Sequence, residues 1–202
     1  MLDRIWDMPG VGLDRKTYYE QMAHETGRLT GLVWKVERSQ FFTEQPDDPA
    51  WQAFSAGDWQ RSLAVFESER TDRQATAARY ARQGSEFRRV RIVEHPVSAY
   101  VQWEMQALKI TNESGQPIRV VDAGKVSDLE HDHPLPELVV VGHQVLFEVC
   151  YDENWASCGA RRIDDPHVIE QAVAEIAQMW AMAEPLADYF AREIAPLPVP
   201  TL

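Results

Sequence analysis

The most regular hydrophobic pattern lies near the C-terminus, between residues 168 and 190. Apolar residues recur there at alternating steps of four and three, namely Val168, Ala172, Ile176, Met179, Ala183, Leu186 and Phe190. This spacing places them on one face of a helix. Asp164 or Asp165 can cap the helix, Pro166 suits its first turn, and Pro185 should kink or split it. The pattern predicts a long C-terminal helix that serves as a core or dimer element.

Apolar periodicity predicts further helices and strands in alternation. The expected helices cover about 17–29, 51–54, 59–66, 71–83 and a segment opening at residue 96 or 98. The expected strands cover 32–42, 87–93, 117–122, 138–141, 144–151 and 157–163. This order favours a single α/β domain, a mixed β-sheet with helices packed on it, and leaves α+β as the alternative. We place the domain at residues 17–195, between an N-terminal extension (1–16) and a proline-rich tail (196–202).

The chain is organised around a strand at residues 87–93, which begins the stretch FRRVRIVEHPVSAYVQWE. Val90 and Ile92 are β-branched and suit a buried strand. Arg89 and Arg91 alternate with them, so that both guanidinium groups project from one face. Two such groups can hold a carboxylate or a phosphate through paired hydrogen bonds.

A proline-broken turn and a helix follow this strand. Pro96 ends the strand and biases His95 away from helical angles. Tyr100, Trp103 and Glu104 then share one face of the next helix. Open α/β sheets bind ligands beyond the carboxyl ends of their strands. The cleft at the His95 turn is therefore the predicted site, with Arg89, Arg91, His95, Tyr100 and Trp103 as the candidate ligand-binding residues.

The charge of the chain narrows the choice of partners. A formal net charge of −12 argues against direct nucleic-acid binding. Residues 61–91 nevertheless hold eight arginines against four acidic residues. Such a run is usually a solvated, ion-paired helix face. The alternative is a basic lip for an anionic ligand or an acidic partner.

Other features indicate a cytoplasmic protein. No apolar run approaches the roughly 20 residues of a membrane helix, and the first residues lack the apolar core of a signal peptide. Cys150 and Cys158 flank a turn-like segment, so we expect reduced thiols on adjacent strands. His131, Asp132, His133 and His143 include metal-ligand types, but nearby prolines indicate a loop. We therefore predict no metal and no cofactor.

The stretches FRRVRIVEHPVSAYVQWE and RRIDDPHVIEQAVAEIAQMWAMAEPLADY resemble an uncharacterised actinobacterial family. Its members are often encoded beside helix-turn-helix regulators or in natural-product gene neighbourhoods. The resemblance covers about 17–190, with Lys35 where arginine is usual. Its pattern falls on Glu37, Gly84, Arg89, Arg91, Pro96, Tyr100, Asp165, Pro166 and Trp180. The late part is similar, more distantly, to phospholipase-D-like domains, which implies a half-domain of that fold. The HxK motif that carries their chemistry is absent.

Two arrangements are open for the predicted site. Glu37, Arg89, Arg91, Tyr100 and Glu104 converge if their strands are neighbours. A carboxylate among arginines then has a lowered pKa and the arginines can grip an anion. The same residues can instead form a structural ion-pair network beneath a helix. In that arrangement Tyr100 belongs to the core, as most such aromatic residues do.

Two functions from different classes follow. The first is a non-catalytic small-molecule-binding or regulatory module that takes a small anionic ligand. The family resemblance implies a helix-turn-helix regulator or a pathway enzyme as its partner, and the stripe of the C-terminal helix leaves a homodimer open. The second is an enzyme of specialised metabolism, of transferase or condensing type, with Glu37 or Glu104 as general base. A pocket lined by Glu37, Arg89, Tyr100 and Glu104 favours the enzyme, whereas a filled core favours the module.

Overall fold

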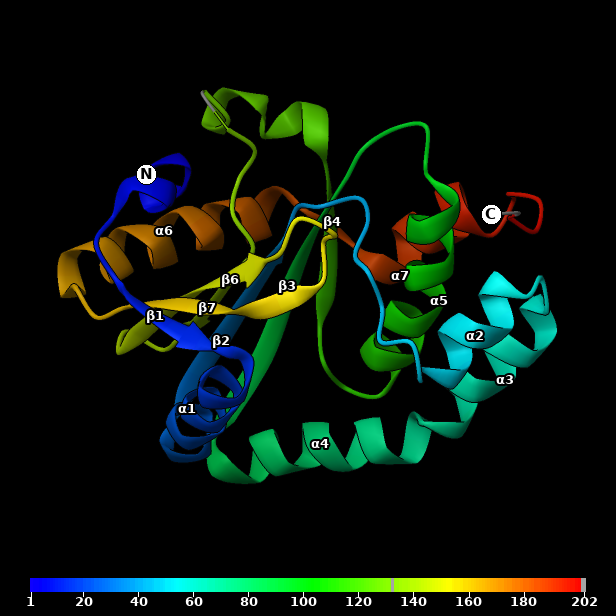
Figure 1. Ribbon diagram of the computed structural model, residues 1–202, viewed down its shortest axis with the longest axis horizontal. Coiled ribbons are helices and arrows are strands. Elements are labelled where there is room, and N and C mark those ends of the chain that lie inside the picture. Colours follow the sequence, from blue (N-terminus) through cyan, green and yellow to red (C-terminus); the bar gives the residue numbers. More distant parts are fainter. Residues whose placement is uncertain (132, 201–202) are drawn as a thin grey trace.

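A computed structural model describes residues 1–131 and 133–200. Its centre is one mixed sheet of eight strands in the order β1-β7-β6-β5-β2-β3-β4-β8 (Figure 1). Only the β2–β3 and β3–β4 pairs are parallel. The strands are β1 (Val11–Asp14), β2 (Gly31–Glu37), β3 (Ser85–Val93), β4 (Ile118–Asp122), β5 (Leu138–Val141), β6 (Val145–Tyr151), β7 (Ser157–Ile163) and β8 (Glu184–Pro185). The expected α/β class and mixed sheet are confirmed.

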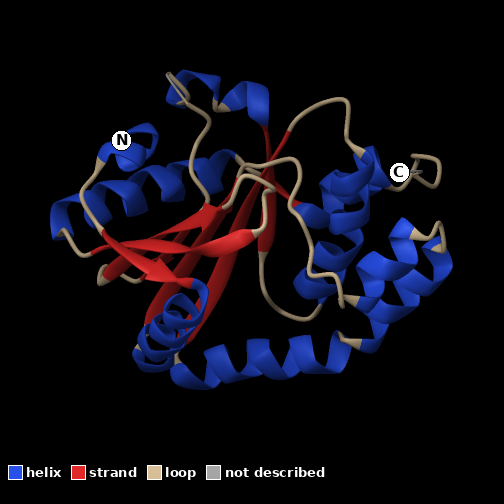
Figure 2. Ribbon diagram, viewed as in Figure 1, coloured by secondary structure: helices blue, strands red, loops and turns tan. Residues whose placement is uncertain are grey.

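Helices cover both faces of the sheet (Figure 2). The α-helices are α1 (Arg15–Arg28), α2 (Pro49–Ser55), α3 (Trp59–Ser68), α4 (Arg70–Gln83), α5 (Ala99–Glu113), α6 (Pro166–Met182) and α7 (Leu186–Tyr189). The short helical turns are η1 (Leu2–Asp7), η2 (Ala123–Lys125), η3 (Ser127–Leu129) and η4 (Phe190–Ile194). None of the helices in the described part of the chain is long and apolar enough to cross a membrane.

Local chemistry sets the helix ends. The side chains of Asp48, Ser98 and Asp165 cap α2, α5 and α6 by accepting backbone N–H groups. Gly84 ends α4 in the left-handed region, at φ 76°. The start of α1 differs from the expected start at about residue 17. Asp14 caps this helix, accepting the N–H of residue 17 at 2.7 Å, so α1 begins two residues earlier.

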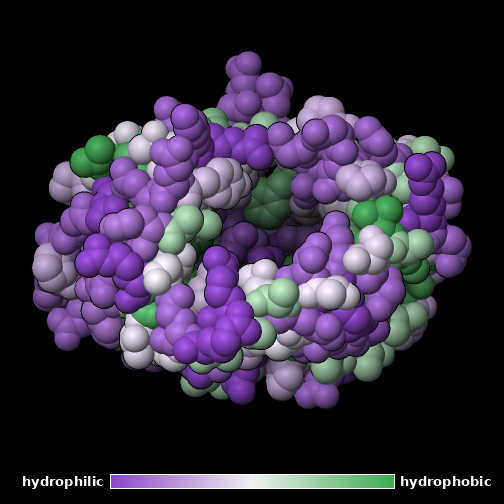
Figure 3. All heavy atoms as spheres, turned by 90° about the horizontal axis from the view of Figure 1, so that it is seen from below, coloured by the Kyte–Doolittle hydropathy of each residue, from purple (hydrophilic) through white to green (hydrophobic). Residues whose placement is uncertain are grey.

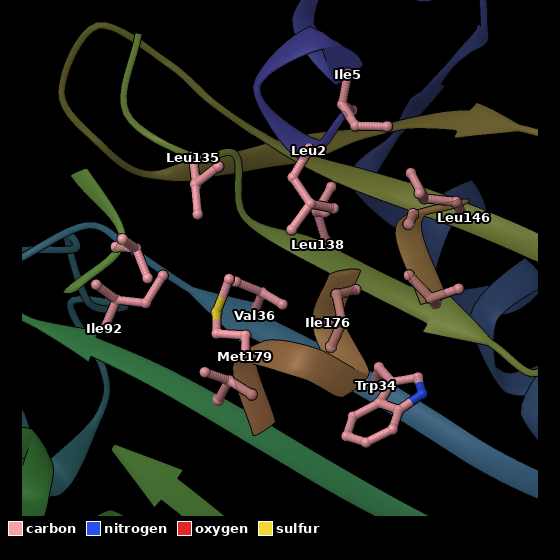
Figure 4. Close-up of a cluster of buried hydrophobic side chains, with 14 of the residues drawn as sticks. Leu2, Ile5, Trp34, Val36, Ile92, Leu135, Leu138, Leu146, Ile176 and Met179 are labelled. Atoms are coloured by element: carbon pink, nitrogen blue, oxygen red, sulfur yellow. The ribbon is translucent and has the colours of Figure 1, made fainter. Parts of the chain in front are cut away.

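The apolar stripe of the C-terminal helix faces the sheet, so α6 is a core element. Ile176 and Met179 are fully buried and pack with Val36 and Ile92 (Figure 4). Pro185 ends the helical run, as expected, and lies in the short edge strand β8 beside β4. The apolar stripe of α6 therefore packs within the core of the domain.

Residues 1–16, expected as an extension, are part of the domain. Leu2 and Ile5 of η1 are 0% exposed and join the core between the sheet and α6 (Figure 4). Strand β1 pairs antiparallel with β7 over Val11–Asp14. A single 3-10 turn and a four-residue strand are too short to show hydrophobic periodicity, which explains why the sequence pattern missed them.

Strand β2 ends at Glu37, five residues before the expected end. The backbone N–H groups of Arg38 and Ser39 donate to the Glu137 carboxylate, at 2.7 and 2.6 Å. These bonds replace ladder bonds and turn the chain out of the sheet. The segment 38–48, light blue in Figure 1, then crosses to α2. We call it the partition segment, because it divides two cavities described below.

Candidate functional site

Five of the predicted site residues line one charged cleft on the face of the sheet that carries α1 and α5, and one of them, Trp103, is described below. Glu37 comes from β2, Arg89 from β3, and Tyr100 and Glu104 from α5. The cleft has a volume of about 360 Å³. Viewed from the side of α1 and α4, the molecule has a deep hollow near its middle with a mainly hydrophilic rim (Figure 3). The predicted convergence of strand and helix residues is therefore present in the structure.

Parallel pairing of β2 and β3 builds the floor of the cleft. The register places Lys35 opposite Arg89 and Glu37 opposite Arg91. Lys35 Nζ lies 2.5 Å from one Glu37 oxygen, and Arg89 Nη1 donates to the other at 3.1 Å. Burial alone raises the pKa of the Glu37 carboxyl, but the charges of Arg89, Lys35 and Arg91 outweigh it and hold this pKa below its usual range. Glu37 is therefore an anchored anion and a poor proton acceptor.

Arg91 is on the same face of β3, two residues beyond Arg89, but it is 0% exposed and does not line the cleft. Its Nε donates to Glu104 Oε2 at 2.9 Å, and its Nη1 donates to the backbone oxygen of Ile92 at 2.9 Å. Burial raises the pKa of Glu104, and the Arg91 charge offsets part of that rise. Arg91 and Glu104 thus form a structural ion pair beneath α5, which is the second of the two arrangements considered above. Arg89 and Glu37 line the cleft.

Aromatic rings and a carboxyl group form one wall. The Tyr100 hydroxyl donates to Glu44, a residue of the partition segment. Burial raises the pKa of Glu44, and the Tyr100 hydrogen bond opposes that rise. Trp103 lines the cleft but is mostly buried, with its Nε1 donating to Ser62 Oγ at 2.8 Å. Its role is mainly packing, whereas Tyr100 and Glu44 present polar atoms at the wall.

His95 lies elsewhere. It lines a separate cavity with Tyr189 and Arg192, and its Nε2 is 3.4 Å from Asp122 Oδ2. The prediction that His95 joins the arginine site is therefore wrong. The turn after β3 faces β4 and the C-terminal residues, whereas the charged cleft opens on the face of the sheet.

Two arginines outside the predicted set complete the cleft. Arg15 begins α1, and Arg73 lies on α4. Arg73 donates to the Ala107 carbonyl, the Thr111 hydroxyl and Glu69. The Nε groups of Arg73 and Arg89 are buried without a hydrogen-bond partner among the described residues. The arginine excess over 61–91 was the only sequence signal for Arg73.

Six of those eight arginines do not line the cleft, and three of the six are ion-paired. Arg70 pairs with Glu67 and Glu113, and Arg88 pairs with Glu86. Only Arg73 and Arg89 of the eight arginines line the cleft. The interpretation of residues 61–91 as a solvated, ion-paired face therefore holds for Arg70 and Arg88. The basic lip at the cleft consists of Arg73 and Arg89.

The thiols and histidines form no metal cluster in the part of the chain that the structure describes. Cys150 and Cys158 are both free thiols near the β6–β7 turn. His131 lies 3.9 Å from Asp3, and His133 packs edge-on to Trp6. Asp132, part of the His-Asp-His segment, lies outside the described residues.

A family model covers residues 20–191 and carries the description domain of unknown function (DUF6879). Because it matches most of the chain, the protein belongs to this family. No curated protein matches the chain. The matched range includes every strand that contributes to the charged cleft.

Proposed function

We propose that this domain is a non-catalytic binding or regulatory module whose charged cleft takes a small ligand with an anionic group. The supporting observation is the pair of buried Nε–H groups of Arg73 and Arg89, which lack acceptors among the described residues. A buried donor without a partner costs about 1–3 kcal/mol, so an anionic acceptor that reached it would gain correspondingly. Arg15 and Lys35 add two more cations at the same cleft.

The carboxylates restrict which anion fits. Glu37, Glu44, Asp48 and Glu104 also line the cleft, which balances the four cations. A compact, highly charged anion would meet these carboxylates wherever it extended beyond the arginines. The arrangement therefore suits one carboxylate or phosphate group on a ligand whose remainder carries hydrogen-bond donors and stacks on Tyr100.

The choice of binding over catalysis rests on the two residues first considered as bases. Glu37 is held by Lys35 and Arg89, and Glu104 by Arg91, so neither is free to accept a proton. The enzyme alternative draws support from the cleft itself and from Glu44. Burial raises the Glu44 pKa and the Tyr100 hydroxyl touches it, which suits an acid–base pair.

The cellular location and the partners of the domain are also part of this proposal. The actinobacterial resemblance supports a cytoplasmic module working beside a helix-turn-helix regulator or an enzyme of specialised metabolism. It supports no phospholipase-D chemistry, because the HxK motif is missing. A homodimer through α6 has less support, since the apolar stripe of that helix packs on the sheet.

Isothermal titration of matched ligands tests the binding proposal. Phosphoserine and O-phosphoethanolamine carry a phosphate with donors, and ethanolamine is the control without the anion. We expect both phosphate compounds to bind and ethanolamine not to bind. Arg89→Lys, which keeps the charge but loses the planar fork, should weaken binding by about tenfold. Arg82→Lys, on the exposed part of α4, is the matched control. Equal affinity of the Arg89 variant and the parent protein would contradict the proposal.

The enzyme alternative needs a different readout. If a bound phosphate compound is chemically altered over hours, Glu44→Gln should abolish the change while retaining binding. Unaltered ligand, recovered and verified by mass spectrometry, supports the binding module.

A further inference from the structure

A second cavity lies at the carboxyl ends of β2 and β3, on the other side of the partition segment. It has a volume of about 500 Å³, within the range of small-molecule sites. Arg38, Ser39 and Gln40 border it where β2 ends, and Glu94 borders it where β3 ends. This is the edge at which open α/β sheets bind ligands. Of the residues that line this cavity, only Tyr151 also lines the charged cleft.

The walls of this end cavity are largely apolar and aromatic. Leu135 and Val149 line it, and Tyr151 lines both cavities. Two tryptophans stand at its border with much of their surface in solvent, Trp6 at 41% and Trp155 at 50% exposed. Exposed tryptophans gathered from distant parts of the chain on one hollow are unusual on a surface with no ligand.

The backbone holds Trp155 in place at a conformational cost. Its φ is 60°, in the left-handed region that bulky residues rarely adopt. Asp152 fixes this turn by accepting the N–H groups of Asn154 and Ala156 on its side chain and that of Trp155 on its carbonyl. Conformations of this kind cost about 1–3 kcal/mol and concentrate at ligand contacts. The turn thus presents an indole to the cavity.

Arg38 and Gln40 are held by neighbouring polar groups, whereas Glu137 keeps one buried oxygen without a partner among the described residues. Arg38 donates to Glu94 at 2.6 Å and to Glu130 at 2.5 Å. Gln40 bonds the Ile92 carbonyl and the Glu94 N–H, which ties the partition segment to β3. Glu137 Oε1 accepts two backbone N–H groups, but the buried Oε2 has no partner among the described residues.

The charges around this oxygen favour a cation. The positive charge of Arg38 is shared by Glu94 and Glu130, and Glu137 adds a third carboxyl group. The Arg91 charge also acts on Glu137, but Arg91 is paired with Glu104. Aromatic faces attract cations, more strongly where water is excluded. An anion would meet uncompensated carboxylates here, in contrast with the charged cleft.

We propose that the end cavity is a second binding site, for a small apolar or aromatic amine whose ammonium group donates to Glu137 Oε2. The apolar body packs against Leu135, Val149 and Trp155, and the ammonium replaces the missing partner of the carboxylate. The site is distinct from the charged cleft and shares only Tyr151 with it. Burial raises the pKa of Glu137 to about 7, so the carboxylate is mostly ionised at pH 8 and available for this bond.

Three naphthalene compounds of similar size provide the test, measured by isothermal titration at pH 8. The first, 2-(1-naphthyl)ethylamine, presents a cation, and the second, 2-(1-naphthyl)ethanol, presents a neutral hydroxyl. The third is the anion of 1-naphthaleneacetic acid. We expect the amine to bind about tenfold tighter than the alcohol, the size of one charge-assisted hydrogen bond, and the anion to bind weakest. Equal affinity of the amine and the anion would overturn the proposal.

Two variants locate the site. Glu137→Gln keeps the acceptor for the backbone N–H groups but loses the charge, and should reduce the amine's affinity to that of the alcohol. Retention of the full preference for the amine overturns the proposal. Trp155→Ala removes an exposed wall and should weaken the amine and the alcohol by a similar factor, even if the Glu137 variant folds poorly. Unchanged binding in the Trp155 variant would place the compounds elsewhere and overturn the site. Glu170→Gln on α6 is the matched control.

Discussion

The buried Glu137 carboxyl gives the sharpest test of the structure, through the pH dependence of stability. Burial is the largest cause of its raised pKa, and the Glu37 charge adds to it. The Ser39 and Arg38 N–H groups and the Arg91 charge oppose the rise, which leaves the pKa at about 7 against an ordinary 4.5. In the unfolded chain the group ionises near the ordinary value.

The sign follows from proton counting. Between pH 4.5 and 7 the folded state holds the proton and the unfolded state has lost it, so stability falls as pH rises. One pKa unit corresponds to about 1.4 kcal/mol, so the shift amounts to about 3 kcal/mol in full. Between pH 5 and pH 8 this residue should cost the protein about 2.5 kcal/mol of unfolding free energy.

Glu137→Gln removes this titration while keeping an oxygen for the two backbone donors. We expect the pH 5 to pH 8 decline in unfolding free energy to be smaller by about 2.5 kcal/mol in the variant, measured by urea unfolding at each pH. Absolute stability can move either way, because the new amide nitrogen needs an acceptor. Glu170→Gln, an exposed change on α6, should leave the decline unaltered. Identical slopes in the parent protein and the Glu137 variant would refute the assignment of a buried, neutralised carboxyl.

Further predictions concern the core, the ion pairs and the thiols. Arg91→Lys should lose about 2–4 kcal/mol in urea unfolding, because Glu104 loses a planar partner, with anion affinity little changed; weakened binding at full stability would place Arg91 in the site. Ile176→Ala and Ile5→Ala should each cost about 2–4 kcal/mol, and a loss below about 0.5 kcal/mol would make either position peripheral. Under reducing conditions two thiols should titrate, the exposed Cys158 before Cys150, whose pKa burial raises; zero free thiols after purification without oxidant would contradict this.

Local signals predicted the elements that have long, periodic or capped sequences. The helix after Asp165, the helix that ends at residue 83 and the adjacent strands at 138–141 and 144–151 depend on neighbours within a few residues. Such patterns are legible without tertiary information. The pairing of Arg89 with Glu37 also followed, because alternation fixes the face once β2 and β3 are adjacent.

The features that were missed depend on contacts between distant residues. Glu137 ends β2 by accepting the backbone N–H of Arg38, a residue 99 positions away in the sequence. No local pattern in the sequence predicts that hydrogen bond. Arg73 enters the cleft because α4 lies beside α5, where it reaches the Ala107 carbonyl. The position of His95 was predicted wrongly because the rule that ligands bind beyond the carboxyl ends of strands identifies only an edge of the sheet. It does not say which strand end opens on a cavity, and here three residues that follow β2 border the end cavity, against only Glu94 after β3.

The partition segment gives the two cavities a common wall. Arg38, Ser39 and Gln40 border the end cavity, whereas residues 42–45 border the charged cleft, and Tyr151 reaches both. A ligand that shifts this wall from one side therefore alters the space on the other. Linkage makes the effect mutual: the factor by which an amine changes affinity for an anion equals the factor by which the anion changes affinity for the amine. Titrating the amine in the presence and absence of the anion would measure this coupling factor.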